Sequence, residues 1–222
     1  MPSKKLHTSK LMNKEIITKQ QRGRPKKNLE ETEENRLSLI FSGVSLLTQK
    51  GFKATGLDEV TKKAGLPKGS FYAYYDSKEL FGLALIDAYD DFFAKMLDRS
   101  YLNEARTPLE RINDFIMEAR TNMVRHNFDR GCLIGNLGQE ITVLPTVFRQ
   151  KLVDVLCKWQ KKTEVCLLKA QTNGEISPNI NCAAKAKLFW IGWEGAILRA
   201  KLECEPDPID AFKEDFEAGL KR

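Results

Sequence analysis

Residues 55–78 read TGLDEVTKKAGLPKGSFYAYYDSK, and this stretch decides the fold. Leu57 and Val60 have the spacing of one face of a helix, and Gly65 is a residue type that commonly ends one. Pro67 suits the first turn of a second helix, where its missing N–H costs nothing. Two short helices joined by a tight turn predict a helix-turn-helix, whose second helix lies in the major groove of DNA.

The second of these helices is expected to begin with small residues and to carry aromatic ones. Gly69 and Ser70 near its start would let backbone N–H groups and the positive end of the helix dipole approach a phosphate. Phe71 and Tyr75 lie four residues apart and are expected to point inward. Candidate DNA contacts are, for the groove and its edges, Lys68, Gly69, Ser70, Phe71, Tyr72, Tyr74 and Tyr75, and, for phosphates, Lys53, Thr55, Gly56 and Lys78. Capping of the first helix is an equally open role for Thr55 and Gly56.

This stretch resembles the helix-turn-helix signature of the TetR/AcrR family of transcriptional regulators. The resembling residues are Gly51-Phe52, Thr55, Val60, Ala64-Gly65, Lys68-Gly69-Ser70-Phe71-Tyr72 and Tyr74-Tyr75-Asp76-Ser77-Lys78-Glu79. The chain departs from the commonest pattern at Thr61, Pro67 and Tyr75, and none of these changes removes a groove contact. The resemblance implies double-stranded DNA with a palindromic operator as partner, a small-molecule effector, and dimerisation through the last two helices.

Size and composition exclude several classes of protein. The chain has 222 residues, of which 42% are hydrophobic and 30% charged, as expected for a soluble protein with a real core. It has no apolar run of the ~20 residues that span a membrane, and its basic N-terminus lacks a signal-peptide core. The five cysteines are odd in number and form no CxxC pair, so neither a disulfide framework nor a metal site is expected. We therefore expect a cytoplasmic protein without a membrane partner or cofactor.

The positive charge is concentrated in the first thirty residues. Residues 1–30 contain nine Lys or Arg against two Glu, whereas the whole chain carries a net charge of +6. Residues 1–32 are interpreted as a mostly disordered basic arm. Within it, RGRP at 22–25 resembles an AT-hook core, which would place Arg22 and Arg24 in an A·T-rich minor groove. Loose phosphate contact and a merely solubilising tail are the alternatives.

Helical periodicity continues to the end of the chain. It predicts an all-α protein of about nine helices, with a helix-turn-helix domain at 33–93 and a ligand-binding and dimerisation domain at 94–222. In the first helix, at 31–50, Leu37 and Phe41 belong to a predicted buried stripe. Ser77, Thr107 with Pro108, and Asn181 are the expected starts of later helices. The helix at 77–97 is expected to connect the two domains.

The helix that starts at Asn181 has apolar and small residues on more than one face. It is expected to be covered on two sides, by its own domain and by a second copy of the chain. A dimer would read two half-sites ~34–36 Å apart or a multiple of that spacing. A central helix in a monomeric bundle is the alternative.

The segment GCLIGNLGQE at 131–140 is the second informative stretch. Together with the recognition-helix sequence, it resembles a TetR-type subgroup that responds to acrylate, N-ethylmaleimide and quinones, in which a cysteine at the position of Cys132 can be reactive. Arg125, His126 and Arg130 are near in sequence and would lower the pKa of its thiol. An inert, buried Cys132 that only fills space is the alternative.

Other polar and aromatic residues were candidates for an effector pocket. Asn136, Tyr89, Trp159 and Trp190 would supply its polar and aromatic walls, although each aromatic is equally compatible with a simple core. An effector that binds better to the form without DNA must weaken DNA binding by the same factor by which DNA weakens effector binding. Reversible ligand binding, covalent sensing at Cys132 and an architectural DNA-binding protein are the open functions. An enzyme is not expected, since no oxyanion-hole or cofactor motif accompanies Cys132.

Overall fold

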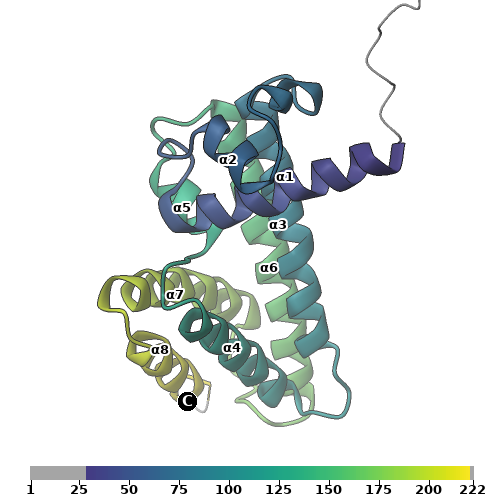
Figure 1. Ribbon diagram of the computed structural model, residues 1–222. Coiled ribbons are helices and arrows are strands. Elements are labelled where there is room, and N and C mark those ends of the chain that lie inside the picture. Colours follow the sequence, from purple (N-terminus) through teal and green to yellow (C-terminus); the bar gives the residue numbers. More distant parts are fainter. Residues whose placement is uncertain (1–28, 221–222) are drawn as a thin grey trace, which may run out of the picture.

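The computed structural model describes residues 29–220, and within them the chain is entirely helical. The predicted all-α class is confirmed, and the expected number of helices agrees closely with the eight α-helices and one 3-10 helix in this range. In chain order these are α1 (Leu29–Lys50), α2 (Leu57–Lys63), η1 (Ser70–Ala73), α3 (Lys78–Tyr101), α4 (Pro108–Arg125), α5 (Leu133–Gln139), α6 (Thr146–Thr172), α7 (Cys182–Glu203) and α8 (Asp207–Ala218) (Figure 1). The predicted basic arm, with Arg22 and Arg24, lies almost entirely outside the described residues.

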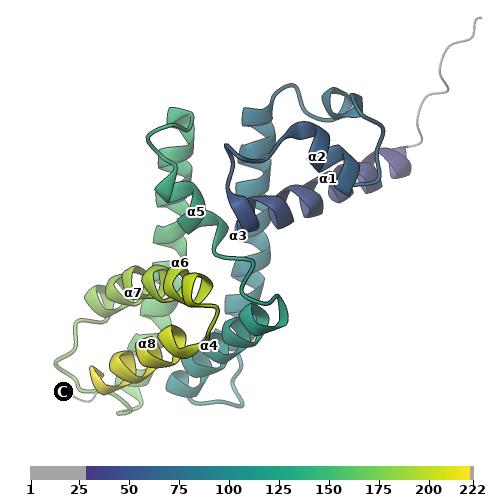
Figure 2. The same cartoon turned by 60° about the vertical axis from the view of Figure 1, so that its left-hand side comes forward.

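Two long helices, α3 and α6, run along the molecule and connect its ends (Figures 1 and 2). Helices α1, α2 and η1 surround the first part of α3, whereas α4, α7 and α8 pack at the other end. The short helix α5 lies beside α1, although nearly 90 residues separate them, so the second half of the chain reaches back to the first. The predicted domain boundary at 93/94 falls inside the continuous helix α3 and stays a prediction. None of the helices in residues 29–220 is long and apolar enough to cross a membrane.

Three of the predicted helix starts are confirmed in detail. The Ser77 hydroxyl accepts the Leu80 amide at the start of α3, and the Asn181 side chain does the same for Ala184 at the start of α7. Thr107 forms a reciprocal capping box with Glu110 at the start of α4. Each cap satisfies backbone donors that the first turn of a helix leaves unpaired.

The predicted apolar stripe of α1 is partly wrong. Leu37 and Phe41 are 47% and 70% exposed, whereas Leu39 and Gly43 are buried. A Cβ at position 43 would lie 2.7 Å from the ring of Phe81, so the absence of a side chain lets α3 approach α1 closely. The buried face of α1 includes small residues, Ser42, Gly43 and Ser45, which a search for large apolar side chains does not find.

Candidate DNA-binding and sensor sites

The helix-turn-helix is present, but its second helix is shorter than predicted. Gly65 ends α2 with φ +71°, as expected from its position. The segment after it forms only the four-residue 3-10 helix η1 instead of an α-helix starting at Pro67. Gly69 precedes η1 with φ +86°, which interrupts a regular helix at that point. The Tyr75 amide still bonds to the Phe71 carbonyl at 3.1 Å, the spacing of an α-helical turn.

Phe71 and Tyr75 position this segment from inside the protein. They are only 2% and 6% exposed, and their rings lie 5.2 and 4.8 Å from that of Phe81. The Tyr75 hydroxyl accepts a hydrogen bond from Arg36 at 3.3 Å. The inward orientation predicted for both residues is confirmed. The prediction that their side chains contact DNA is wrong, because buried side chains cannot reach a groove.

The exposed side of the same segment carries the remaining DNA candidates. Tyr72 is 64% exposed, and the side chain of Lys68 is 81% exposed while forming a 2.7 Å ion pair with Asp58. Lys53, Gly56 and Gly69 are also exposed, and Ser70 and Tyr74 are half-buried beside them. Exposed lysine and tyrosine side chains of this kind commonly contact DNA phosphates.

Thr55 and Lys78 are committed to contacts within the protein. The Thr55 hydroxyl is buried and donates to the Gly51 carbonyl at 2.7 Å. The Lys78 ammonium donates to the Phe52 carbonyl at 2.8 Å and lies 4.5 Å from the Phe52 ring centroid. Burial and then the charge of Lys53 lower the Lys78 pKa. The predicted phosphate contacts by these two side chains are therefore corrected to structural roles, and Gly56 is the residue at the α2 N-cap.

Asn136 binds the end of α1 instead of lining a pocket. Its side-chain amide donates to the Leu47 and Thr48 carbonyls at 3.1 and 3.0 Å. The Gly131 amide donates to the same Thr48 carbonyl at 3.0 Å. The last carbonyls of a helix have no partner within it, so these donors satisfy them. This corrects the prediction of Asn136 as a ligand contact.

A third donor to the end of α1 comes from α7. The Lys201 ammonium donates to the Gln49 carbonyl at 2.8 Å and to that of Thr48 at 3.2 Å. Burial lowers its pKa. A cation is favoured there by the negative end of the α1 dipole.

Glu140, at the end of α5, holds the turn that follows α1. Its carboxylate accepts the amides of Phe52 and Lys53 at 3.0 and 2.9 Å. Gly51 precedes them with φ +81°, and a Cβ there would lie 1.7 Å from a Glu140 oxygen. In the sequence, the one local signal of this contact is Gly51, next to the helix-turn-helix.

Cys132 is buried beside a carboxyl group, not beside the predicted basic residues. It immediately precedes α5 and is 6% exposed. Burial, and then the charge of Glu194 on α7, raise the pKa of its thiol well above the ordinary value. The predicted lowering by Arg125, His126 and Arg130 is therefore wrong, because proximity in sequence did not bring these groups to the thiol.

Glu194 is the polar group that the sequence analysis missed. Burial raises its pKa to about 7. Its Oε1 atom is buried and has no hydrogen-bond partner within residues 29–220. Its other oxygen lies 2.0 Å from where a Cβ would stand on Gly135, so a side chain at that position would displace the carboxyl group.

The predicted aromatic sensor residues lie in or beside the core. Trp159 and Trp190 are fully buried with ring centroids 5.1 Å apart. Their indole N–H groups donate to Asp90 at 2.9 Å and to Thr163 at 3.0 Å. Tyr89 is half-buried next to this cluster and near Cys132, and burial followed by the charge of Cys132 raises its pKa. The two tryptophans are thus corrected to core residues, and of the three aromatic candidates Tyr89 is the one whose pKa is influenced by Cys132.

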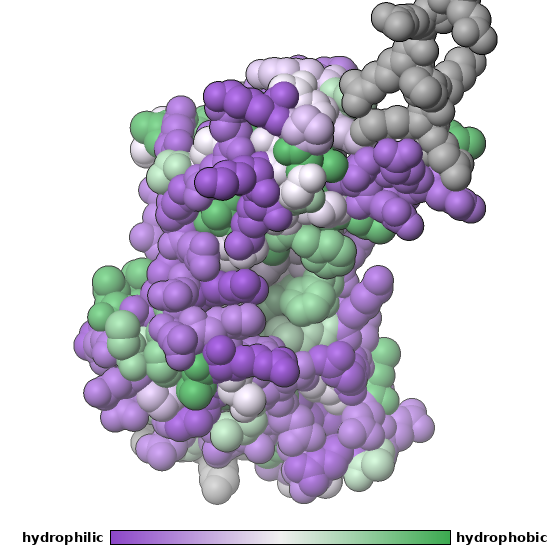
Figure 3. All heavy atoms as spheres, viewed as in Figure 1, coloured by the Kyte–Doolittle hydropathy of each residue, from purple (hydrophilic) through white to green (hydrophobic). Residues whose placement is uncertain are grey.

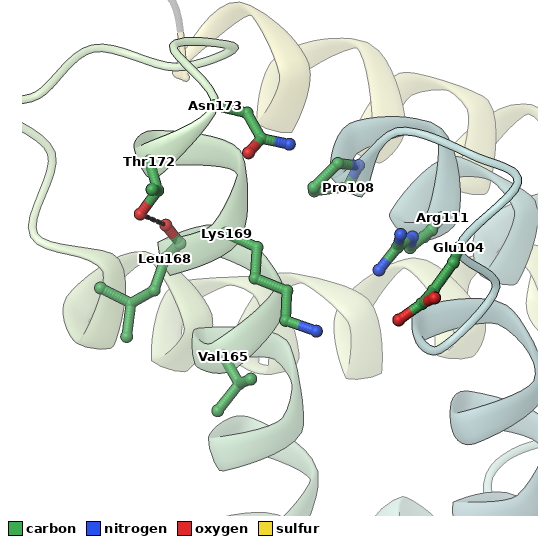
Figure 4. Close-up of a pocket in the computed structure, with 8 residues that line it drawn as sticks. All are labelled: Glu104, Pro108, Arg111, Val165, Leu168, Lys169, Thr172 and Asn173. Carbon is green, nitrogen blue, oxygen red and sulfur yellow. Dashed lines mark hydrogen bonds between the residues drawn. The ribbon is translucent and has the colours of Figure 1, made fainter.

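An open pocket lies at the far end of the molecule, between the start of α4 and the end of α6. It has a volume of about 430 Å³, and the basic groups of Arg111 and Lys169 converge there with the carboxylate of Glu104 (Figure 4). Pro108, Leu168 and Thr172 contribute to its wall. None of the predicted sensor residues lines this pocket.

The surface of α7 and α8 includes an uncovered apolar face. Leu188, Ile191 and Leu202 on α7 are 58%, 60% and 70% exposed. Beside them a groove of about 440 Å³ runs between α7 and α8 past Gly192 and Phe212. Figure 3 shows apolar side chains at the edge of the molecule where these helices lie, on a surface that is otherwise mainly hydrophilic.

The comparisons with known proteins agree with this geometry. Residues 39–84 match the family profile described as "Bacterial regulatory proteins, tetR family", and residues 108–216 match "Tetracyclin repressor-like, C-terminal domain". The transcriptional regulator AcuR of Cereibacter sphaeroides is 48% identical over 201 residues, which are 90% of this chain and 91% of AcuR. The chain belongs to the TetR family. Its members bind operator DNA and small-molecule effectors, usually as dimers.

Solved structures resemble this TetR-family chain over most of its length. The regulatory protein TetR from Rhodobacter sphaeroides is 49% identical, with a TM-score of 0.81 over 83% of this chain and 97% of that protein. The reduced form of NemR from E. coli is 25% identical, with a TM-score of 0.75 over 83% of this chain and 97% of NemR. The TetR-family chain is a DNA-binding transcriptional repressor with a ligand-sensing C-terminal domain.

Proposed function

We propose that the chain is a homodimeric repressor that leaves its palindromic operator when an electrophile reacts with Cys132. The observation that carries this proposal is the contact between α5 and the end of α1. A single segment, residues 131–140, has Cys132 near its start and Glu140 at its end. Between them, Asn136 bonds to the last carbonyls of α1.

This arrangement gives a direct route from the thiol to the DNA-binding surface. An adduct on the buried Cys132 adds volume at the start of α5, where Gly135 already leaves no space for a side chain. Helix α5 must then shift, because close-packed interiors accommodate extra atoms only by moving. The shift is transmitted through Asn136 and Glu140 to the end of α1 and the turn before α2. DNA affinity then falls by the same factor by which DNA disfavours the shifted form.

A second copy of the chain is the proposed occupant of the apolar face of α7 and α8. Exposed apolar side chains such as Ile191 and Leu202 favour burial in an interface. The groove beside Gly192 would admit side chains of the partner. A two-fold dimer presents two copies of η1 to successive major grooves, ~34–36 Å apart or a multiple of it. In this dimer, Tyr72 and Lys68 of each subunit face the DNA.

Reversible effector binding is the second candidate, and the pocket in Figure 4 supports it. Arg111 and Lys169 would attract the carboxylate of a small amphipathic ligand, with Leu168 against its apolar part. Such a ligand would act without any covalent bond. This pocket lies away from Cys132, so the two candidates make opposite predictions for a cysteine variant.

Operator binding separates the two candidates. Fluorescence anisotropy on DNA from upstream of its own gene is measured for the reduced protein before and after treatment with N-ethylmaleimide. Covalent sensing predicts that operator affinity falls at least about fivefold, the lower end of typical allosteric coupling. Cys132→Ser should abolish this response, whereas Cys157→Ser, which alters an exposed cysteine on α6, should retain it. An unchanged response in Cys132→Ser would refute covalent sensing at this residue.

A further inference from the structure

Three ionisable side chains from three different helices or their flanking residues meet inside the protein. Tyr89 comes from α3, Cys132 from the residue before α5, and Glu194 from α7. Burial and then the charges of Cys132 and Glu194 raise the Tyr89 pKa, and Cys132 and Glu194 each shift the pKa of the other. Neither the proposed allosteric route nor the core packing explains why an acidic side chain, Glu194, is buried at this position.

Glu194 is held in a position that leaves one of its oxygens unused. The side chain lies so close to Gly135 that a Cβ there would be 2.0 Å from Oε2 and 3.7 Å from the Cβ of Cys132. The Oε1 atom is buried, and within residues 29–220 it has no hydrogen-bond partner. A buried carboxyl oxygen without a partner is costly, and such exceptions are commonly found where a protein uses the group. The same carboxyl group is electrostatically coupled to the Cys132 thiol, since each shifts the pKa of the other.

We propose that Glu194 is the proton acceptor for the addition of Cys132 to an uncharged α,β-unsaturated carbonyl compound. This inference rests on the proposed function and assigns a new role within the same site. It also names the class of effector: small neutral enones, enals, quinones or acrylic esters and amides.

The step balances without any oxidant or reductant. The carboxylate of Glu194 takes the proton from the Cys132 thiol as the sulfur forms a bond to the β-carbon of the electrophile. The π electrons of the C=C bond move to the carbonyl oxygen, which gives an enolate. Glu194 then returns the proton to the α-carbon, and the product is a thioether with the carboxylate regenerated.

Burial explains why the thiol needs a base. The raised pKa of Cys132 leaves very little free thiolate at neutral pH, and the thiolate is the nucleophile. A pKa near 7 for Glu194 leaves a substantial share of it as carboxylate at the same pH, which suits a general base. Proton transfer by a positioned base typically accelerates a reaction by about 10²–10⁴-fold. The negative charge of Glu194 also disfavours a separate thiolate, so the coupled transfer is the favoured route.

The same carboxyl group selects against anionic electrophiles. A carboxylate ligand placed beside Glu194 would be repelled by it unless Glu194 took up a proton. Protonated Glu194 could hold such a ligand by a hydrogen bond, but it could no longer accept the proton of Cys132. Anions would therefore add slowly, even where they bind.

The test measures adduct formation at Cys132 in the full chain by intact-protein and peptide mass spectrometry. Cys157→Ser and Cys204→Ser are introduced first, because these exposed thiols would otherwise react. Methyl acrylate and acrylate are the probes, and each rate is divided by the rate of the same probe with glutathione. Glu194→Gln keeps the shape of the side chain and removes its basicity. Glu205→Gln, which alters an exposed carboxyl group outside both pockets, is the matched control.

We expect Glu194→Gln to lower the methyl acrylate rate at Cys132 about 100-fold at pH near 7, with Glu205→Gln unchanged. The normalised preference for methyl acrylate over acrylate should also shrink in Glu194→Gln. Thermal melting and operator binding of the untreated variant show whether it is folded. Equal or faster reaction of folded Glu194→Gln overturns the inference and leaves covalent sensing intact. Absence of any Cys132 adduct in the parent protein overturns covalent sensing itself, together with this role for Glu194.

Discussion

The backbone amide of Lys53 donates a hydrogen bond of 2.9 Å to the carboxylate of Glu140, 87 positions later in the chain. The neighbouring Phe52 amide bonds to the other oxygen of the same carboxylate at 3.0 Å. The turn that leads into the DNA-binding helices is thus fixed by a side chain of the ligand-sensing half. This contact makes the position of α2 depend on the position of α5.

Glu140→Ala is expected to weaken both stability and communication between the two halves. The variant loses two hydrogen bonds to a charged acceptor, so the free energy of unfolding should fall by about 1.5–3 kcal/mol. The ratio of operator affinities without and with N-ethylmaleimide should move toward one. Urea denaturation and anisotropy titrations measure the two effects, with Glu205→Ala, at an exposed position outside both pockets, as the control. A normal effector response in Glu140→Ala would show that this carboxylate does not transmit the signal.

Gly51→Ala should be more damaging than Gly65→Ala. Both glycines have positive φ, +81° and +71°, so alanine is strained by roughly 1–2 kcal/mol at either position. Only at position 51 does the new Cβ also collide with Glu140, whereas nothing lies within 4 Å of it at position 65. In denaturation curves, the loss of stability in Gly51→Ala should therefore exceed the shared strain, whereas the loss in Gly65→Ala should not. Equal losses of stability would contradict the close contact between Gly51 and Glu140.

Tyr72→Ala and Tyr75→Ala are predicted to have opposite profiles. Tyr72 is 64% exposed, so its removal should lower operator affinity by about 1–3 kcal/mol and leave the melting temperature almost unchanged. Tyr75 is buried against Phe81, so its removal should lower the free energy of unfolding by about 3 kcal/mol or more. Calorimetry and operator titrations distinguish the two. Undiminished operator binding by Tyr72→Ala would remove it from the groove contacts.

The stability of the protein should depend on pH through Glu194. Its pKa is raised to about 7 by burial, against about 4.3 for a free glutamate. Between these values the folded state holds a proton that the unfolded state has lost, so stability falls as pH rises through this window and stays low above it. Glu194→Gln is neutral throughout, so its advantage over the parent protein should grow from pH ~5 to pH ~8, to about 3 kcal/mol at most. A constant advantage for Glu194→Gln across this range would mean that the carboxyl group of Glu194 is charged when folded.

Local sequence signals located several elements of the fold. Caps at Ser77, Thr107 and Asn181 act on donors within their own first turn, so sequence alone located them. The inward direction of Phe71 and Tyr75 also follows from helical spacing. The length of the second helix did not follow, since the left-handed backbone at Gly69 was not anticipated.

The sensor site depended on tertiary contacts that the sequence does not reveal. Arg125, His126 and Arg130 are close to Cys132 in the chain, which predicts a basic environment for its thiol. The fold instead places Glu194 from α7 near it. A polar residue among apolar ones, such as Asn136, suggests a ligand contact. In the structure its side chain bonds instead to the Leu47 carbonyl at the end of α1. Nothing local could identify the partners of either residue.

Hydrogen exchange at the amides of Phe52 and Lys53 tests most directly whether the state of Cys132 reaches the DNA-binding domain. These amides are held by Glu140, and their exchange reports the opening of that contact. Mass spectrometry should find that a Cys132 adduct accelerates their exchange at least about tenfold in the parent protein, with no change in Cys132→Ser given the same treatment. Unchanged exchange at these two amides, in protein that carries the adduct and has lost operator affinity, would contradict this route.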